Sequence, residues 1–258
     1  MVNAAPTTPS RHIVELAHGL AVREWQQKDI ASSAHHLNNK NVLANMRNRI
    51  PNPYTEADAA SWIKFCQDPA NHVRSGEWTA EGGSEGPAVS PSFAITANDV
   101  AVGGIGLDFK DDIYFRTAEI GYWLGEEFWG QGVMSRVLPP FIEWAWQTFG
   151  ILVRVSGETY EANAAVGKVL QKGGFKYEGR RPDMVCKNGV IGATLMWGAL
   201  RPRKRKQVQN DNTYATKTTS PSLTKYVYHA TNGPYHAIVL SATASSAADF
   251  AVLAGWFE

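Results

Sequence analysis

Residues 118–136 read Ala-Glu-Ile-Gly-Tyr-Trp-Leu-Gly-Glu-Glu-Phe-Trp-Gly-Gln-Gly-Val-Met-Ser-Arg, and the rest of the chain is organised around this stretch. In its first half, large apolar residues alternate with the others, which predicts a strand. The apolar set is Ile120, Tyr122 and Leu124, and Glu119 is the lone carboxylate on the opposite face. A Trp-Gly-Gln-Gly turn at residues 129–132 follows, and apolar residues at helical spacing come directly after it. A strand, a glycine turn and a helix in this order leave unpaired backbone N–H groups that can bind phosphate oxygens.

A glycine turn of this length, taken alone, indicates only a bend in the chain. The stretch resembles, however, the acetyl-CoA loop of the GNAT superfamily of N-acetyltransferases, in which Gln/Arg-x-x-Gly-x-Gly/Ala cradles the pyrophosphate of coenzyme A. Gly132 matches the central glycine, whereas Trp129 replaces the usual Gln or Arg and Met134 replaces the last small residue. The turn and the preceding strand are similar to those of the RimJ/RimL-like branch, whose members acetylate protein N-termini and some small amines.

A second stretch, residues 159–175, strengthens the resemblance. It is similar to the Asn-x-x-Ala/Ser-x-x-Val-Leu-Glu-Lys-x-Gly-Phe segment that flanks coenzyme A in the same family, with a helix capped by Asn163 and ended by two glycines at 173 and 174. Two such stretches in the right order are much more specific than either alone. The resemblance covers about residues 22–200 and implies an α/β GNAT fold, with a mixed, mostly antiparallel sheet that is splayed at the acetyl-CoA site and flanked by helices.

The resemblance also implies where acetyl-CoA binds as a co-substrate. The pyrophosphate would contact backbone amides of residues 130–135, the pantetheine arm would pair with the strand edge around residues 123 and 124, and Asn163 would contact the arm from the other side. The cofactor-binding residues are therefore expected to be Trp123, Leu124, Trp129, Gly130, Gln131, Gly132, Val133, Met134, Ser135 and Asn163. No metal is expected.

Acyl transfer to an amine needs a neutral nucleophile and donors for the developing oxyanion. Glu119 is the candidate general base, acting through a water, because an α-amino group with a pKa of about 7.7 to 8.0 needs only modest help to lose its proton. The alternative is that Glu119 is a strand carboxylate in an ion pair. Many family members use a Tyr to reprotonate the leaving thiolate, but Leu170 occupies that position here, so the general acid is unassigned.

The segments before residue 118 predict two helices and an antiparallel meander. A first strand is expected within residues 13–25, followed by a short helix that Asp29 caps and that exposes the pair His35-His36. Thr55 and Asp58 resemble a capping box at the start of a second helix, whose apolar stripe is Ala59, Trp62, Ile63 and Cys66.

Further along the chain, residues 77–92 are expected to be a mobile loop, and residues 93–96 and 100–107 to be strands. The two prolines at 139 and 140 predict a kink in the helix after the glycine turn. Residues 152–156 should form a strand beside the one at 118–124, and residues after 175 a closing hairpin with an Asn-Gly turn at 188–189.

Composition limits the class of protein. The chain has 258 residues, with 25 Lys and Arg against 24 Asp and Glu, so its net charge of about +1 argues against nucleic acid or an anionic membrane as a partner. It has no run of eighteen apolar residues and no signal-peptide core at its N-terminus, and its two cysteines read as free thiols. These features favour a cytoplasmic protein. A basic block at residues 201–206 leaves a nuclear location open.

We expect three regions: a flexible leader (1–11), a GNAT domain (12–200) and a basic and polar tail (201–258) that is dispensable from residue 207. Three functions compete. An acetyl-CoA-dependent N-acetyltransferase acting on a primary amine, either a protein N-terminus or a small molecule, is favoured. A catalytically silent acetyl-CoA-binding module is supported by the departures at Met134 and Leu170, and a nucleic-acid-associated protein only by the basic block. The protein could be a monomer or a homodimer.

Overall fold

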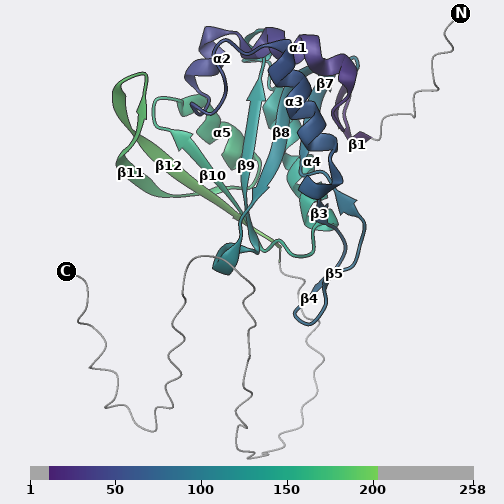
Figure 1. Ribbon diagram of the computed structural model, residues 1–258. Coiled ribbons are helices and arrows are strands. Elements are labelled where there is room, and N and C mark those ends of the chain that lie inside the picture. Colours follow the sequence, from purple (N-terminus) through teal and green to yellow (C-terminus); the bar gives the residue numbers. More distant parts are fainter. Residues whose placement is uncertain (1–11, 203–258) are drawn as a thin grey trace, which may run out of the picture. The chain divides into compact units, whose positions relative to one another are not determined.

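The computed structural model describes residues 12–202, and these form a mixed eight-stranded sheet with helices on both faces (Figure 1). The strand order is β1-β2-β7-β8-β9-β10-β12-β11. The strands are β1 (His12–Glu15), β2 (Leu20–Arg23), β7 (Ser92–Ala97), β8 (Val100–Phe109), β9 (Thr117–Leu124), β10 (Arg154–Tyr160), β11 (Lys176–Lys187) and β12 (Val190–Leu200). The expected leader and almost all of the expected tail lie outside the described residues.

Three helices cover one face of the sheet and two cover the other. The first group is α1 (Ile30–Leu37), α2 (Lys40–Ala44) and α3 (Glu56–Gln67), and the second is α4 (Val133–Thr148) and α5 (Ala164–Lys172). Alternation along β7 shows both layers, because Phe93 and Ile95 join the core under α4 whereas Ala94 packs with Ile63 of α3. Within residues 12–202, no helix combines the length and the apolar character needed to span a bilayer.

β9 and β10 form the parallel pair of this sheet, and they stay paired over only three positions, which end at Ser156 opposite Glu119. Beyond that point β9 remains bonded to β8 and β10 to β12, so the two central strands diverge (Figure 1). A mostly antiparallel sheet that is splayed between its central strands confirms the predicted α/β GNAT fold.

The helix that follows the glycine turn is held by its apolar face. Val137, Leu138 and Phe141 of α4 are fully buried, and burying a side chain of this size contributes about 1.5 to 3 kcal/mol. The helix continues through Pro139 and Pro140 without interruption. Packing against the sheet thus offsets the hydrogen bond that each proline removes.

Two segments within the first hundred residues contain more strands than expected. The predicted strand within 13–25 is present as β2, but β1 precedes it and the two form a hairpin, because the chain reverses at His18 and Gly19, both of which have positive φ. The predicted loop at 77–92 contains paired short strands: β4 (Trp78–Thr79) with β5 (Gly83–Ser84), and β6 (Ala88–Val89) with β3 (Val73–Arg74).

The helix α3 begins as predicted, with the Thr55 side chain accepting a hydrogen bond from the Asp58 backbone and the Asp58 side chain accepting one from the Thr55 backbone. The Thr55 hydroxyl and the Thr55 backbone N–H both donate to the Asp58 carboxylate, and these bonds lower the pKa of that carboxyl. Ile63 and Cys66 are buried, and Cys66 and Cys186 are free thiols, as expected. The placement of Trp62 in the apolar stripe was wrong, since its ring is exposed and stacks on another surface aromatic, Phe65.

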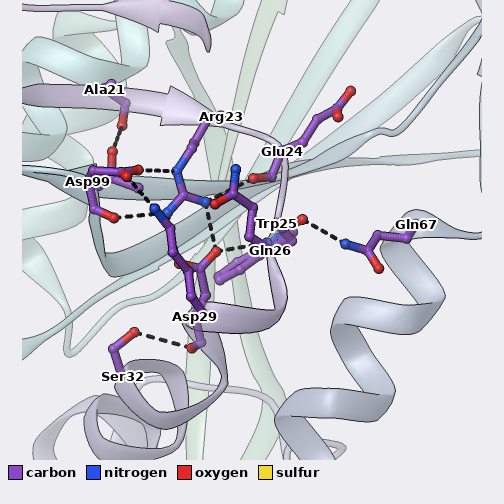
Figure 2. A network of polar contacts seen from close by, with 11 residues as sticks. Ala21, Arg23, Glu24, Trp25, Gln26, Asp29, Ser32, Gln67 and Asp99 are labelled. Atoms are coloured by element: carbon purple, nitrogen blue, oxygen red, sulfur yellow. Dashed lines mark hydrogen bonds and ion pairs between the residues drawn. The ribbon is translucent and has the colours of Figure 1, made fainter. Parts of the chain in front are cut away.

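Asp29 is the N-cap residue of α1, as predicted, but its side chain makes no capping hydrogen bond to the helix. Its carboxylate is buried and accepts two hydrogen bonds from the guanidinium of Arg23, at 2.7 and 2.8 Å (Figure 2). Asp99, at the β7–β8 turn, accepts a third at 2.8 Å. Burial opposes the charge on Arg23, but its bonds to Asp29 and Asp99 outweigh that effect and raise the pKa of the guanidinium.

Asp29→Asn is expected to lower the free energy of unfolding by about 3 kcal/mol, because Arg23 would be left buried without a full countercharge. Urea unfolding of the parent and the variant measures the difference. Glu24→Gln, which removes a neighbouring carboxylate whose residue is exposed, is the control and should change stability by less than about 0.5 kcal/mol. Equal losses in the two variants would show that the buried pair has no special role.

Candidate functional site

A cavity of about 730 Å³ lies where β9 and β10 separate. It has two ends. One is formed by the start of α4 and one face of α5, and the other by the connection between α2 and α3 together with residues of β8, β9 and β10. The second end includes Asn45, Met46, Arg47, Arg49, Asp108, Glu119, Glu158 and Tyr160.

Nearly all of the residues expected at the site line this one cavity. They are Glu119, Trp123, Leu124, Trp129, Gly130, Gly132, Val133, Met134, Ser135 and Asn163. Gln131 is the exception, since it is exposed and its side-chain amide donates to the carbonyl of Glu127 at 2.5 Å. Gln131 is thus the one residue of the glycine turn that does not line the cavity, and the sequence motif alone did not indicate this.

The glycine turn presents bare backbone to the cavity. Gly130 and Gly132 have φ of +72° and +70°, a left-handed conformation that favours glycine, and a Cβ placed on either would have no atom within 4 Å. Gly132 is also the N-cap of α4 and supplies no capping side chain. The first N–H groups of α4 therefore have neither an intrahelical partner nor a side-chain cap, which is how a helix binds an anion.

Sequence reasoning missed two cations beside this turn. Lys168 and Lys172 of α5 line the same cavity and are exposed. Their spacing of four residues, on one face of a predicted helix, was the available signal. The expected cap at the start of α5 was wrong in detail: Asn163 occupies the N-cap position, but its side chain makes no capping hydrogen bond. Its amide is thus available to the cavity.

Glu119 stands at the point where the strands part, and it is paired with two cations. Lys110 donates to it at 3.1 Å, and the guanidinium of Arg47 from the α2–α3 connection donates to its other oxygen. The same guanidinium lies 3.8 Å from a carboxylate oxygen of Glu158 on β10. Arg47 is therefore held between two carboxylates on neighbouring strands, and Glu158 is a second acid that sequence reasoning missed.

Two polar atoms in this cavity are buried and have no hydrogen-bond partner within the described residues: Oε1 of Glu158 and the hydroxyl of Tyr122. Burial raises the pKa of Tyr122, so its hydroxyl stays protonated. Buried polar groups in folded proteins are nearly always bonded, so two unpartnered atoms that line one cavity are candidate partners for a ligand. The nearby Leu170 is fully buried and offers no hydroxyl.

The α2–α3 connection is fixed from the opposite side of the cavity. Lys187, near the tip of the β11–β12 hairpin, donates to the carbonyl of Met46 at 2.7 Å and to the side chain of Asn48 at 2.8 Å. The hydroxyl of Tyr160 donates to the same carbonyl at 3.5 Å. These bonds hold the chain around Arg47 over the open end of the splayed strands.

The expected exposure of the pair His35-His36 was wrong for one member. His36 is buried beneath the turn at Gly125, where a Cβ on the glycine would come within 2.6 Å of the imidazole. Burial lowers the pKa of His36, although Glu127 at 3.8 Å opposes the shift. This close contact supports the segment that leads into the glycine turn.

Comparison with known proteins agrees with this geometry. Residues 20–176 match the model of the acetyltransferase (GNAT) domain. A curated relative, the uncharacterized N-acetyltransferase YoaA of Bacillus subtilis, is 30% identical over 89 residues, which are 34% of this chain and 50% of YoaA. The match thus spans only half the length of that relative.

Solved structures share the fold at low identity. The ribosomal-protein-S5-alanine acetyltransferase of Vibrio fischeri superposes with a TM-score of 0.59 at 18% identity, over 75% of this chain and 97% of its own. RimJ of Mycobacterium smegmatis, solved with a CoA disulfide, gives 0.55 at 18% identity, over 70% and 81%. Because the family model spans more than half of the chain, this protein belongs to the GNAT acetyltransferase family.

Proposed function

We propose that this protein is an N-acetyltransferase that uses acetyl-CoA as its donor and a primary amine as its acceptor. The observation that carries the proposal is a single cavity with an anion-binding helix start at one end and two carboxylates at the other. Between these ends, Tyr122 and Glu158 present buried polar atoms that no described residue satisfies. A donor with phosphates and an acceptor with a cationic amine match the two ends in charge.

The cofactor end fits coenzyme A. Backbone N–H groups of residues 133–135 can bind the pyrophosphate, and Lys168 and Lys172 add positive charge beside them. The edge of β9 from Ile120 to Leu124 faces away from β8 and is unpaired with β10, so it can bond an extended pantetheine arm as a further strand would. Acetyl-CoA, when bound, supplies the acetyl group as an activated thioester.

The acceptor end must bind a protonated amine and then remove its proton, so that the neutral amine can attack the thioester. We propose that the ammonium enters between Glu119 and Glu158, where the guanidinium of Arg47 now lies. Glu119 remains the candidate base acting through a water. Glu158 is a second candidate, favoured by its unpartnered oxygen, whereas both oxygens of Glu119 already accept hydrogen bonds from cations.

Leu170 occupies the position at which many family members have a proton-donating Tyr, so the general acid must be another residue. Tyr122 is our candidate for this role. Its hydroxyl lies in the same cavity, is buried, and stays protonated because burial raises its pKa. A preorganised donor of this kind stabilises negative charge that develops on a departing sulfur or a carbonyl oxygen.

Release of free thiol from acetyl-CoA, measured over a panel of peptides with free N-termini and of small amines, tests the proposal. We expect turnover with at least one class of primary amine and none with N-acetylated peptides. Tight acetyl-CoA binding without thiol release across the whole panel would instead indicate the silent binding module. The basic block behind the nucleic-acid hypothesis lies largely outside the described residues.

A further inference from the structure

We propose that the acceptor is a protein N-terminus with acidic side chains at about its third to fifth residues, and that these bind a second, cationic cavity next to the amine site. This inference rests on the proposed function and specifies its substrate class. The second cavity, of about 630 Å³, is lined by residues of β9, β10, β11 and β12 and of the β8–β9 connection.

The floors of the two cavities are continuous. On β9, Thr117 lines the second cavity, and Glu119, two residues further along the same face, lines the first. On β10, Ser156 and Glu158 repeat this arrangement. Residues two apart on a strand are about 7 Å apart, so the second cavity begins roughly that far from the proposed amine site. Glu119 and Lys110 join the two cavities directly through their 3.1 Å ion pair.

The second cavity carries an excess of positive charge. Its cations are Lys110, Arg154, Arg180 and Arg181, and its carboxylates are Asp111 and Glu178. Arg154 is paired with Glu178, Arg180 forms a two-bond pair with Glu161, and Lys110 is shared between Asp108 and Glu119. Arg181 is exposed and has no ion pair or side-chain hydrogen bond within the described residues. Of the four cations that line this cavity, Arg181 is therefore the one without a carboxylate partner among the described residues, and it is free to bind an anionic partner.

The shape of this surface favours an extended peptide. Figure 1 shows β10 and β12 in front of α5, so this face of the two strands is not covered by that helix. An extended chain rises about 3.3 Å per residue. With its α-amine between Glu119 and Glu158, its third residue would lie near Thr117 and Ser156. The next residues would then reach the cations, which gives acidic side chains at these positions charge-assisted partners.

The test compares two peptides that differ only in charge: Ala-Ser-Glu-Glu-Glu-Leu-Tyr and Ala-Ser-Gln-Gln-Gln-Leu-Tyr. We expect the full-length protein to acetylate the acidic peptide with a kcat/KM about tenfold higher at low salt, mainly through KM. The preference should shrink in 0.5 M salt, because charges near the surface are then screened.

The double variant Arg154→Gln/Arg181→Gln should reduce the preference to within about twofold while leaving kcat/KM for the neutral peptide unchanged. Arg74→Gln is the matched control, because Arg74 is an exposed arginine of β3 that lines neither cavity. Melting temperatures of both variants show that any change in KM does not come from unfolding. A preference that survives in the double variant would overturn the inference.

Equilibrium binding of the fluorescein-labelled peptides in the presence of CoA separates this inference from the proposed function. If no peptide is acetylated but the acidic peptide binds through Arg154 and Arg181, the proposed function fails and the acidic-peptide site remains. If both peptides are acetylated with equal kcat/KM, the proposed function stands and the site is wrong.

Discussion

Gly132→Val is expected to weaken acetyl-CoA binding by about 10³-fold, the loss that follows when two or three charge-assisted hydrogen bonds to phosphate disappear. Gly132 has a φ of +70° and faces open cavity, so a branched side chain both strains the turn and occupies the space in which a phosphate would approach the backbone. Titration calorimetry with acetyl-CoA measures the change. Normal binding by this variant would show that the phosphate-loop assignment is wrong.

Gly83→Val is the matched control for backbone strain. Gly83 is the first residue of β5, has a φ of +67°, and likewise has no atom within 4 Å of a Cβ. Both substitutions impose a similar left-handed penalty, of about 1 to 3 kcal/mol for a β-branched residue. We therefore expect similar decreases in melting temperature and a binding defect only in Gly132→Val. A binding defect in Gly83→Val would point to general destabilisation.

Glu119→Gln is expected to lower kcat by about 10²-fold near neutral pH while leaving acetyl-CoA affinity almost unchanged. Gln has a similar shape and can still accept a hydrogen bond from Lys110 or Arg47, but it cannot take a proton from the amine. The acceptor α-amine, with a pKa of about 7.7 to 8.0, is mostly protonated below that range and neutral above it. The deficit of a variant without its base should therefore shrink as pH rises past 8.

Glu158→Gln decides which carboxylate is the base. Glu158 lines the same end of the cavity on the neighbouring strand, so it is the natural comparison. If the deficit that depends on pH appears in Glu158→Gln and the deficit of Glu119→Gln is flat with pH, then Glu158 accepts the proton and Glu119 only positions Arg47. Flat deficits in both variants would remove both residues from the proton transfer.

The sequence alone determined the parts of the fold that depend on neighbouring residues. Alternation predicted β9, the Asn-Gly pair at 188–189 predicted the β11–β12 turn, and Thr55 with Asp58 marked the start of α3. The glycine turn was equally local, because a left-handed φ at Gly132 is a property of that residue and its immediate neighbours. Together with the resemblance, these signals were enough to predict the family and most of the residues that line one end of the cavity.

Only the tertiary structure revealed the proposed acceptor end, because its contacts join residues that are far apart in the chain. Arg47 reaches Glu119 across 72 positions, and Lys187 holds Met46 across 141. No periodicity encodes such pairs. The same reason explains Asp29, whose short polar side chain suited a helix cap by local rules but is held by Arg23 in the fold. The unsatisfied atoms of Glu158 and Tyr122 are likewise visible only once the strands have diverged, since burial and missing partners are properties of the folded chain.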